Sequence, residues 1–178
     1  MSKNIFDKDD YNSPDGMLTS VWGPPLWHTL HTISFNYPVK PTKDDIENYY
    51  SFFKNLKNVL PCKYCRTNLS KNLKDVKLNK KVFKNRESLA KWVYDLHENV
   101  NKMLGKKSRL SYKDVRERYE HFRARCLNDQ VKTKKEKGCT DSLYGMKGKC
   151  ILNIVPKKLK LNSFQIDPKC KITRGKKK

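Results

Sequence analysis

ESLAKWVYDLHENVNKML, residues 87–104, is the stretch that decides the fold class of this chain of 178 residues. Its apolar side chains recur every three or four positions and form one stripe, as in an amphipathic helix that buries one face. The stripe consists of Leu89, Trp92, Val93, Leu96, Val100, Met103 and Leu104. Gly105 follows directly, and a glycine at this position predicts the end of the helix.

The same periodicity predicts three helices before this stretch and a shorter one after it. They are expected over residues 24–37, 44–60, 62–71 and 111–126. Pro24 and Pro25 suit the first turn of the first helix, because a missing N–H costs nothing there. Ser111 and Asp114 resemble a capping box that opens the last one. No strand pattern precedes residue 127, so the predicted class is all-α, a compact bundle with antiparallel neighbours.

The two ends of the chain differ in composition from this helical region. Residues 1–19 are polar and contain a turn signal, so they are predicted to be a loosely ordered lead-in. Residues 127–178 carry fifteen Lys or Arg against four Asp or Glu, without a sustained period. This composition predicts a lysine-rich, largely irregular C-terminal tail. The expected organisation is a lead-in, a helical domain over residues 20–126, and the tail.

The net charge of +22 would attract nucleic acid, anionic membrane or an acidic protein. Because the charge is spread as lysine over the whole chain, without a nucleic-acid-binding motif, a solvated basic surface is the favoured interpretation. No apolar run of about 18 residues is present, which argues against a membrane span. The polar start does not resemble a signal peptide. The expected location is therefore the compartment of synthesis, the cytoplasm.

Leu60-Pro61-Cys62-Lys63-Tyr64-Cys65 contains the chain's only Cys-x-x-Cys. Cysteines at this spacing can form a disulfide within one helical turn. A helix starting just after Pro61 would direct free N–H groups at the sulfurs and favour the thiolate, which is the nucleophile in disulfide exchange. The alternative is half of a zinc knuckle, but this needs two more ligands at short spacing, and none follows. Redox chemistry is favoured over metal binding.

Trp27 and His31 lie four residues apart, as do His97 and Asn101, so each pair projects from one face of its helix. Taken singly, each of these side chains is more often part of a core than of a binding site. Two such pairs beside a redox-active dithiol could together hold a flat, polar-edged cofactor between helices.

These motifs, in this order, resemble the flavin-linked sulfhydryl oxidases of the Erv/ALR type. The motifs are WGPPLWHTLH at 22–31, YP at 37–38, PCKYC at 61–65, Trp92, LHENVN at 96–101 and LGK at 104–106. The resemblance covers roughly Val21 to Cys126. It implies a bundle of four helices plus a short fifth, which binds FAD non-covalently and forms a homodimer.

The resemblance also implies the chemistry and the site residues. A substrate dithiol would attack the Cys62–Cys65 disulfide, and the electrons would pass to the flavin and then to O2, giving H2O2. Cys62 would exchange with the substrate and Cys65 would face the flavin. The residues implied to contact FAD are Gly23, Trp27, His31, Tyr37, His97, Val100, Asn101, Lys106, Arg118 and Tyr119. Among them, Trp27 and the histidines would pack around adenine and ribose, and Lys106 and Arg118 would be partners for the diphosphate.

Three positions depart from the family pattern. Tyr94 and Tyr112 occupy the places where many cellular members have the cysteines of a structural disulfide. Within residues 97–101 the acidic residue and the first asparagine of the usual His-Asn-x-Val-Asn are exchanged, and Arg118-Tyr119 replaces Arg-Trp. In lacking this disulfide, the chain resembles the minimal viral members of the family. If the chain is viral, the expected locations are the host cytoplasm and the virion.

The tail cysteines leave several pairings open. Cys139 and Cys150 could form the second dithiol that family members carry on a flexible arm, where it shuttles electrons from the substrate. Ten residues separate them, however, and Cys126 or Cys170 could equally pair with either. The alternative is a structural bridge between tail and bundle.

The predicted function is an FAD-dependent thiol oxidase that forms disulfides in a protein partner, such as a thioredoxin-like dithiol carrier. The rival is a basic module that binds nucleic acid, for instance in a virion, and holds structural zinc with Cys62, Cys65 and either His97 or Cys126. A thioredoxin-like reductase or isomerase would need strands around its Cys-x-x-Cys, and none is predicted.

Overall fold

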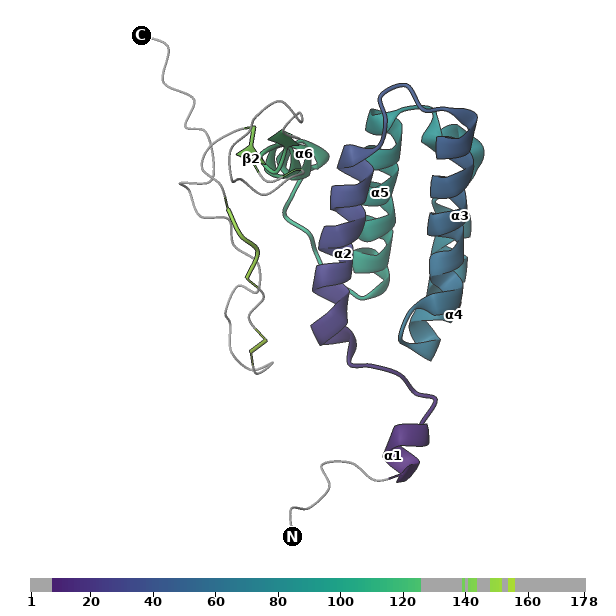
Figure 1. Cartoon of the computed structure of the whole chain (residues 1–178). Helices are drawn as coiled ribbons and strands as arrows, with labels where there is room; N and C mark the ends of the chain where they lie inside the picture. The colour runs from purple at the N-terminus through teal and green to yellow at the C-terminus, as the bar shows by residue number, and fades with distance from the viewer. Residues whose placement is uncertain (1–7, 126–138, 140, 144–147, 152–153, 156–178) are drawn as a thin grey trace. The chain divides into compact units, whose positions relative to one another are not determined.

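The structure is a computed structural model that describes residues 8–125, 139, 141–143, 148–151 and 154–155 (Figure 1). The chain divides into two units, Met1–Ser108 and Arg109–Lys178. Each unit is described by itself. None of the described helices is both long enough and apolar enough to cross a membrane.

The first unit consists of helices, and the chain runs through them in an up-and-down order (Figure 1). Their bounds are α1 Lys8–Asn12, α2 Thr19–Asn36, α3 Lys43–Val59, α4 Lys63–Asp75 and α5 Arg86–Met103, with a 3-10 turn at Lys80–Phe83. Helix α2 packs mainly on α5, and α3 packs on α4 and on the 3-10 turn. These four long helices form the predicted bundle, and the all-α class is confirmed.

Local capping signals explain where the best-predicted helices begin. Thr42 and Asp45 form a reciprocal capping box at the start of α3. The Asn85 side chain accepts a hydrogen bond from the Ser88 N–H at the start of α5. Gly105, with φ of +65°, follows the end of α5, where a left-handed residue stops a helix.

Helix α2 begins earlier than predicted. It starts at Thr19, so Pro24 and Pro25 lie inside the helix rather than in its first turn. Each proline lacks an N–H, so two hydrogen bonds of the helix cannot form. The first turn of α2 is nevertheless tied to the residue before the helix, since the Trp22 indole N–H donates to the Met17 carbonyl at 2.9 Å. Helix α4 also runs beyond the predicted end, because Leu69, Asn72 and Leu73 continue its buried face to Asp75.

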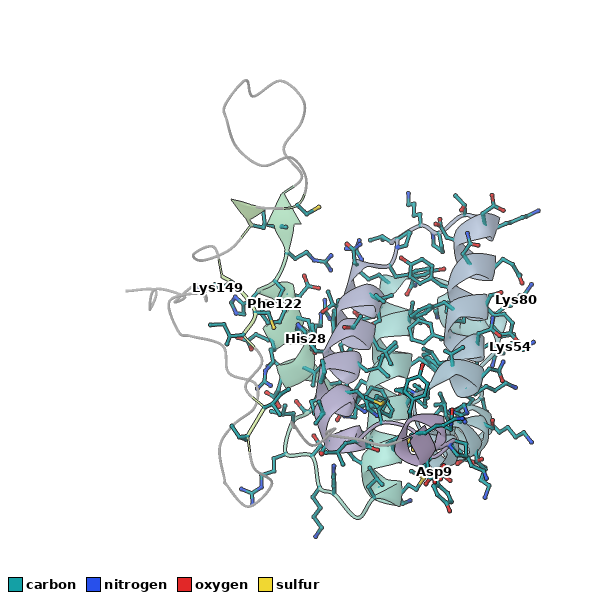
Figure 2. All side chains as sticks on the ribbon, turned by 60° about the horizontal axis from the view of Figure 1, so that its bottom comes forward. Asp9, His28, Lys54, Lys80, Phe122 and Lys149 are labelled. Carbon is teal, nitrogen blue, oxygen red and sulfur yellow. The ribbon has the colours of Figure 1, made fainter. Side chains whose placement is uncertain are left out.

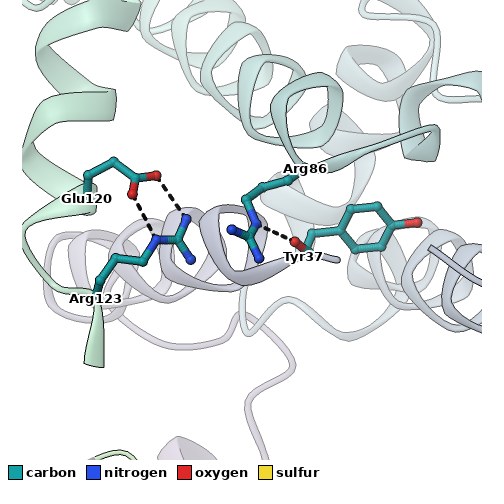
Figure 3. Close-up of polar contacts among 4 residues, drawn as sticks. All are labelled: Tyr37, Arg86, Glu120 and Arg123. Atoms are coloured by element: carbon teal, nitrogen blue, oxygen red, sulfur yellow. Dashed lines mark hydrogen bonds and ion pairs between the residues drawn. The ribbon is translucent and has the colours of Figure 1, made fainter. Parts of the chain in front are cut away.

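Aromatic side chains fill the core between the four long helices. Phe53 and Phe83 are fully buried, and Trp92 donates its indole N–H to the Val76 carbonyl at 3.0 Å. The fully buried Tyr37 donates its hydroxyl to the Phe83 carbonyl at 2.8 Å. Its own carbonyl accepts the Nε–H of Arg86 at 2.5 Å (Figure 3). Charged side chains such as Lys54 and Lys80 point away from this core (Figure 2).

The second unit contains the short fifth helix, α6, over Tyr112–Glu120. The predicted capping box of Ser111 and Asp114 opens it. The helix ends before the predicted residue 126, because two short strands follow, β1 Ala124–Arg125 and β2 Asp141–Ser142, paired antiparallel. Glu120 and Arg123 form a bidentate ion pair at the turn between helix and strand (Figure 3). Most of the predicted irregular tail lies outside the described residues.

Candidate redox site

The Cys-x-x-Cys pair lies where α3 ends and α4 begins. Cys62 is the N-cap residue of α4, and its sulfur accepts the backbone N–H of Cys65 at 3.2 Å. Both thiols are free and partly exposed. The expectation that a helix start would direct N–H groups toward a sulfur is therefore confirmed at Cys62.

The two thiols have opposite acidities. The pKa of Cys62 is lowered, first by a hydrogen bond from the Cys65 side chain and further by the Cys65 backbone N–H. The pKa of Cys65 is raised, first by burial and then by that same hydrogen bond to Cys62. In the reduced pair, Cys62 is therefore the thiol that loses its proton more readily. A thiol of low pKa is also the better leaving group when a disulfide to it is broken.

Arg66 fixes the turn that carries the pair. Its guanidinium donates to the Leu60 carbonyl at 2.6 Å, and its backbone N–H donates to the Cys62 carbonyl at 3.1 Å. Sequence reasoning missed this residue, because an arginine in the first turn of a helix has no distinctive pattern.

The lead-in also reaches the pair, although it was predicted to be loosely ordered. Gly16 forms an antiparallel bridge with Cys62, and the Met17 N–H donates to the Pro61 carbonyl at 2.7 Å. The Thr19 hydroxyl lies 4.0 Å from the Cys65 sulfur. Sequence reasoning took the turn before Gly16 as a sign of looseness, although a glycine after Pro-Asp could equally have signalled a close backbone approach.

A second group of site residues meets between α2 and α5, and we call Trp27, His31 and His97 the aromatic cluster. The Trp27 and His97 rings are stacked, with centroids 4.0 Å apart and planes 4° apart. The Nε2 of His31 and the Nδ1 of His97 are joined by a hydrogen bond of 3.1 Å. Burial, as the largest cause, lowers the pKa of His31 to about 3 and that of His97 to about 4, so both rings are neutral at pH 7.

The end of α5 carries the exchanged pair of the motif. Glu98 accepts a hydrogen bond from the side-chain amide nitrogen of Asn101 at 3.0 Å. Because the amide nitrogen of Asn101 faces Glu98, the side-chain oxygen of Asn101 faces away from Glu98 and can accept a hydrogen bond. The backbone carbonyl of Asn101 accepts the backbone N–H of Lys106 at 2.8 Å, which holds Lys106 next to Asn101. Asn99, the other exchanged residue, donates instead to Asn72 at 3.0 Å.

Residues 24–120 match the model of the Erv1 / Alr family. The chain belongs to the Erv1/Alr family. The family members are FAD-linked sulfhydryl oxidases, so this chain is an enzyme that uses FAD and oxidises thiols to disulfides.

Viral and cellular family members both resemble the chain. An FAD-linked sulfhydryl oxidase of Acanthamoeba polyphaga mimivirus is 39% identical over 58% of this chain and 72% of its own length. One from African swine fever virus is 30% identical over 56% of this chain and 80% of its own length. The mitochondrial enzyme of Saccharomyces cerevisiae is 29% identical over 54% of this chain and 49% of its own length.

Solved structures support the fold. The yeast Erv1 core has a TM-score of 0.52 and 23% identity over 66% of this chain and 92% of its own. The FAD binding domain of yeast Erv1 has a TM-score of 0.51 and 25% identity over 58% of this chain and 94% of its own. The predictions of the Erv/ALR family, the fold and the FAD cofactor are confirmed.

The Erv1/Alr family resemblance implies further site residues, and the structure brings only some of them together. Gly23 lies on α2 one turn before Trp27, and Val100 is half-buried next to Asn101 on α5. Tyr37 lies fully inside the core near the other end of α2. Arg118 and Tyr119 lie on α6 in the second unit, where burial raises the pKa of Tyr119. Cys139 and Cys150 are not joined to each other: Cys139 is in a disulfide and Cys150 is an exposed free thiol.

The residues of the first unit fit FAD in their chemistry. Trp27 offers a partly exposed aromatic ring, Asn101 offers a side-chain oxygen, and Lys106 adds a cation for a diphosphate. A Cβ built at Gly23 would meet no heavy atom nearer than the Thr19 methyl at 3.7 Å, so this side of α2 is open to a ligand. Because Trp27 and His97 stack directly on each other, a flat ring would pack on the outer face of the aromatic cluster rather than between these two rings.

The rival prediction of a zinc-holding module finds no support in the part of the chain that the structure describes. Within it, no group of three or more His, Cys, Asp or Glu side chains is arranged to hold a metal ion. Cys126, one of the predicted ligands, lies outside the described residues. Family membership favours the oxidase.

Proposed function

We propose that Cys62 and Cys65 are the catalytic dithiol of this enzyme and that its substrates are protein dithiols. The observation that carries the proposal is the hydrogen-bonded pair at the start of α4, with the thiolate favoured at the more exposed Cys62. A thiolate at an exposed sulfur is the form that takes part in disulfide exchange.

The proposed cycle begins with the pair oxidised. A substrate thiolate attacks the Cys62 sulfur, the Cys62–Cys65 bond breaks, and its electron pair goes to the Cys65 sulfur. The second substrate thiolate then attacks the mixed disulfide, so that the substrate disulfide forms and Cys62 leaves as a thiolate. The lowered pKa of Cys62 favours this last step. FAD, when bound, supplies a two-electron acceptor whose reduced form is reoxidised by O2 to give H2O2.

The cofactor-binding role of the family-implied residues is part of this proposal. Trp27, His31 and His97 would provide the aromatic surface, and Asn101 and Lys106 would provide polar contacts. The proposed set also includes Gly23, Tyr37, Val100, Arg118 and Tyr119. Its support comes from the Erv1/Alr family membership and from the contacts within the first unit.

Further proposals concern the whole protein. We take residues 20–126 as the functional domain, a homodimer as the assembly, and a thioredoxin-like protein as the substrate. The viral relatives support a location in host cytoplasm or virion. A shuttle role for Cys139 and Cys150 requires Cys139 to exchange its present disulfide for one with Cys150.

The test is the visible absorption spectrum of the purified protein, followed by anaerobic addition of dithiothreitol. We expect flavin bands that bleach with the dithiol and return in air with formation of H2O2. A protein whose bound flavin does not bleach, or bleaches equally without Cys62 and Cys65, would refute the proposed electron path.

A further inference from the structure

Exposed apolar side chains flank the Cys62–Cys65 pair. We call Met17, Leu18 and Tyr64 the rim. Met17 and Leu18 are each 69% exposed and Tyr64 is 78% exposed. They come from two distant stretches of the chain, the lead-in and the first turn of α4. Apolar side chains gathered at the surface around one site mark an interaction surface more often than chance exposure.

The lead-in is held in place by its backbone. The Met17 N–H donates to the Pro61 carbonyl at 2.7 Å, and the Met17 carbonyl accepts the Trp22 indole N–H at 2.9 Å. Both polar groups of the Met17 backbone are thus satisfied, which leaves its exposed side chain on an anchored segment. Figure 2, turned so that this end of the bundle comes forward, shows Asp9 of α1 in front of the helices.

Gly16 makes this anchoring possible. Its φ is +101°, a conformation that other residues rarely adopt. A Cβ at this position would lie 2.5 Å from the Pro61 carbonyl oxygen and 3.0 Å from the Cys62 Cα. Only glycine therefore allows the lead-in to lie this close to the redox pair. The segment lies before residue 24, where the match to the family model begins.

Disulfide exchange at Cys62 indicates which molecule would bind to the rim. Disulfide exchange brings a substrate sulfur to about 2 Å from the Cys62 sulfur in the mixed disulfide. The polypeptide that carries this sulfur must then lie against the residues next to Cys62. A small dithiol has no polypeptide to place there, so it would not use the rim.

We propose that Met17, Leu18 and Tyr64 dock the apolar residues that flank the reactive cysteine of a protein dithiol, and so favour protein substrates over small thiols. This inference rests on the proposed function, in which Cys62 exchanges with the substrate. The lead-in is thus part of the substrate site, anchored there by Gly16.

The test compares two substrates, reduced thioredoxin and dithiothreitol, in the flavin-loaded full chain. In the double variant Met17→Lys, Leu18→Lys, we expect KM for thioredoxin to rise about tenfold, while kcat/KM for dithiothreitol stays within about twofold of wild type. A rise in KM at constant kcat is the mark of lost substrate binding. An equal loss with both substrates, or no change with thioredoxin, would overturn the proposal.

A second variant and a control separate docking from charge. Gly16→Ala adds no charge but displaces the lead-in, and its Cβ also presses on the Cys62 backbone, so it should lower kcat/KM for thioredoxin by a larger factor than kcat/KM for dithiothreitol. Val39→Lys places one new positive charge, against two in the rim variant, on a residue that is 60% exposed in the loop before α3. This loop lies about 25 Å along α3 from Cys62. If Val39→Lys raised KM for thioredoxin by half or more of the rise, on a logarithmic scale, that the rim variant gives, charge alone would explain the effect and the rim would be excluded.

The proposed function and the rim can fail separately. A wild-type protein that does not oxidise dithiothreitol would refute the function itself. Normal oxidation of dithiothreitol, with thioredoxin kinetics unaffected by the rim and Gly16 variants, would refute only the docking role.

Discussion

The redox pair and the aromatic cluster control ionisable groups by opposite means. At the start of α4, Cys62 is partly exposed, and hydrogen bonds from Cys65 lower its pKa and favour charge. Between α2 and α5, His31 and His97 are buried, and burial lowers their pKa and removes charge. A lowered pKa thus means a thiolate in one region and a neutral ring in the other.

In the proposed function, this difference separates the two tasks of the enzyme. The charged sulfur lies where a protein can reach it, since exchange needs a thiolate and an open approach. The neutral rings lie where an aromatic ligand can pack without meeting a buried charge. Each region can therefore be altered without the other, which the following predictions use.

The largest effect is expected from removing the thiol that we propose faces the flavin. Cys65→Ser removes the Cys62–Cys65 disulfide that the substrate thiolate would break, so thiol oxidase turnover should fall by more than about a thousandfold. The aromatic cluster is unchanged, so flavin should stay bound. The measurement is oxygen consumption with dithiothreitol together with the flavin absorbance. Full turnover in this variant would contradict the role of the pair, and loss of flavin would show that the two regions are not independent.

Acid should destabilise the aromatic cluster rather than the redox pair. His31 and His97 have pKa values of about 3 and about 4 in the folded chain, below the 6.5 of a free histidine. The unfolded chain therefore binds protons that the folded chain does not, and stability falls as pH drops below 6.5. Between pH 7 and pH 5, we expect a loss of about 2 kcal/mol for each histidine.

Urea unfolding at pH 7, 6 and 5 measures this loss, and the carboxylates stay ionised over that range. His97→Gln should remove about half of the pH dependence, whereas Cys62→Ser should leave it unchanged. A free energy of unfolding that is constant from pH 7 to pH 5 would contradict the buried neutral histidines.

A smaller effect is expected at the Thr19 hydroxyl. Its hydrogen bonding is among the causes that lower the pKa of both thiols. Thr19→Val should therefore raise both pKa values, by less than about one unit. The rate of alkylation by iodoacetamide, followed against pH for each cysteine by mass spectrometry, measures the shift. Thr29→Val, which removes a hydroxyl bonded to the Pro25 carbonyl on the same helix, should give no shift.

Local patterns predicted the best-defined helices closely. Residues 44–60 and 87–104 were expected to be helical, and the observed bounds are Lys43–Val59 and Arg86–Met103. Both helices have a single apolar face and a side-chain cap at the start. Each of these signals depends only on residues that are close in the sequence. The motif order was likewise enough to identify the family and its cofactor.

Contacts between distant residues could not be predicted in the same way. Gly16 pairs with Cys62 across 46 residues, and α2 begins at Thr19, before its prolines. The spacing of Trp27, His31 and His97 predicted shared faces, but only packing of α2 on α5 shows that Trp27 and His97 stack on each other. Thr19 and Arg66 act through their positions in space and have no motif.

The smallest effect is expected at Glu98, which joins the aromatic cluster to the polar end of α5. Glu98 lies next to His97 in sequence and holds the Asn101 amide nitrogen at 3.0 Å, so the Asn101 oxygen is left as an acceptor. Glu98→Ala frees this amide to rotate, and we expect FAD to bind about threefold to tenfold more weakly, as for one lost hydrogen bond. Glu98→Gln keeps a carbonyl oxygen in the same place, so its affinity for FAD should stay close to that of wild type. Fluorescence titration of the flavin-free protein with FAD measures both. If the two variants weakened binding equally, the charge of Glu98 would be responsible rather than the orientation of Asn101, and the exchanged motif would act through the electrostatics of His97.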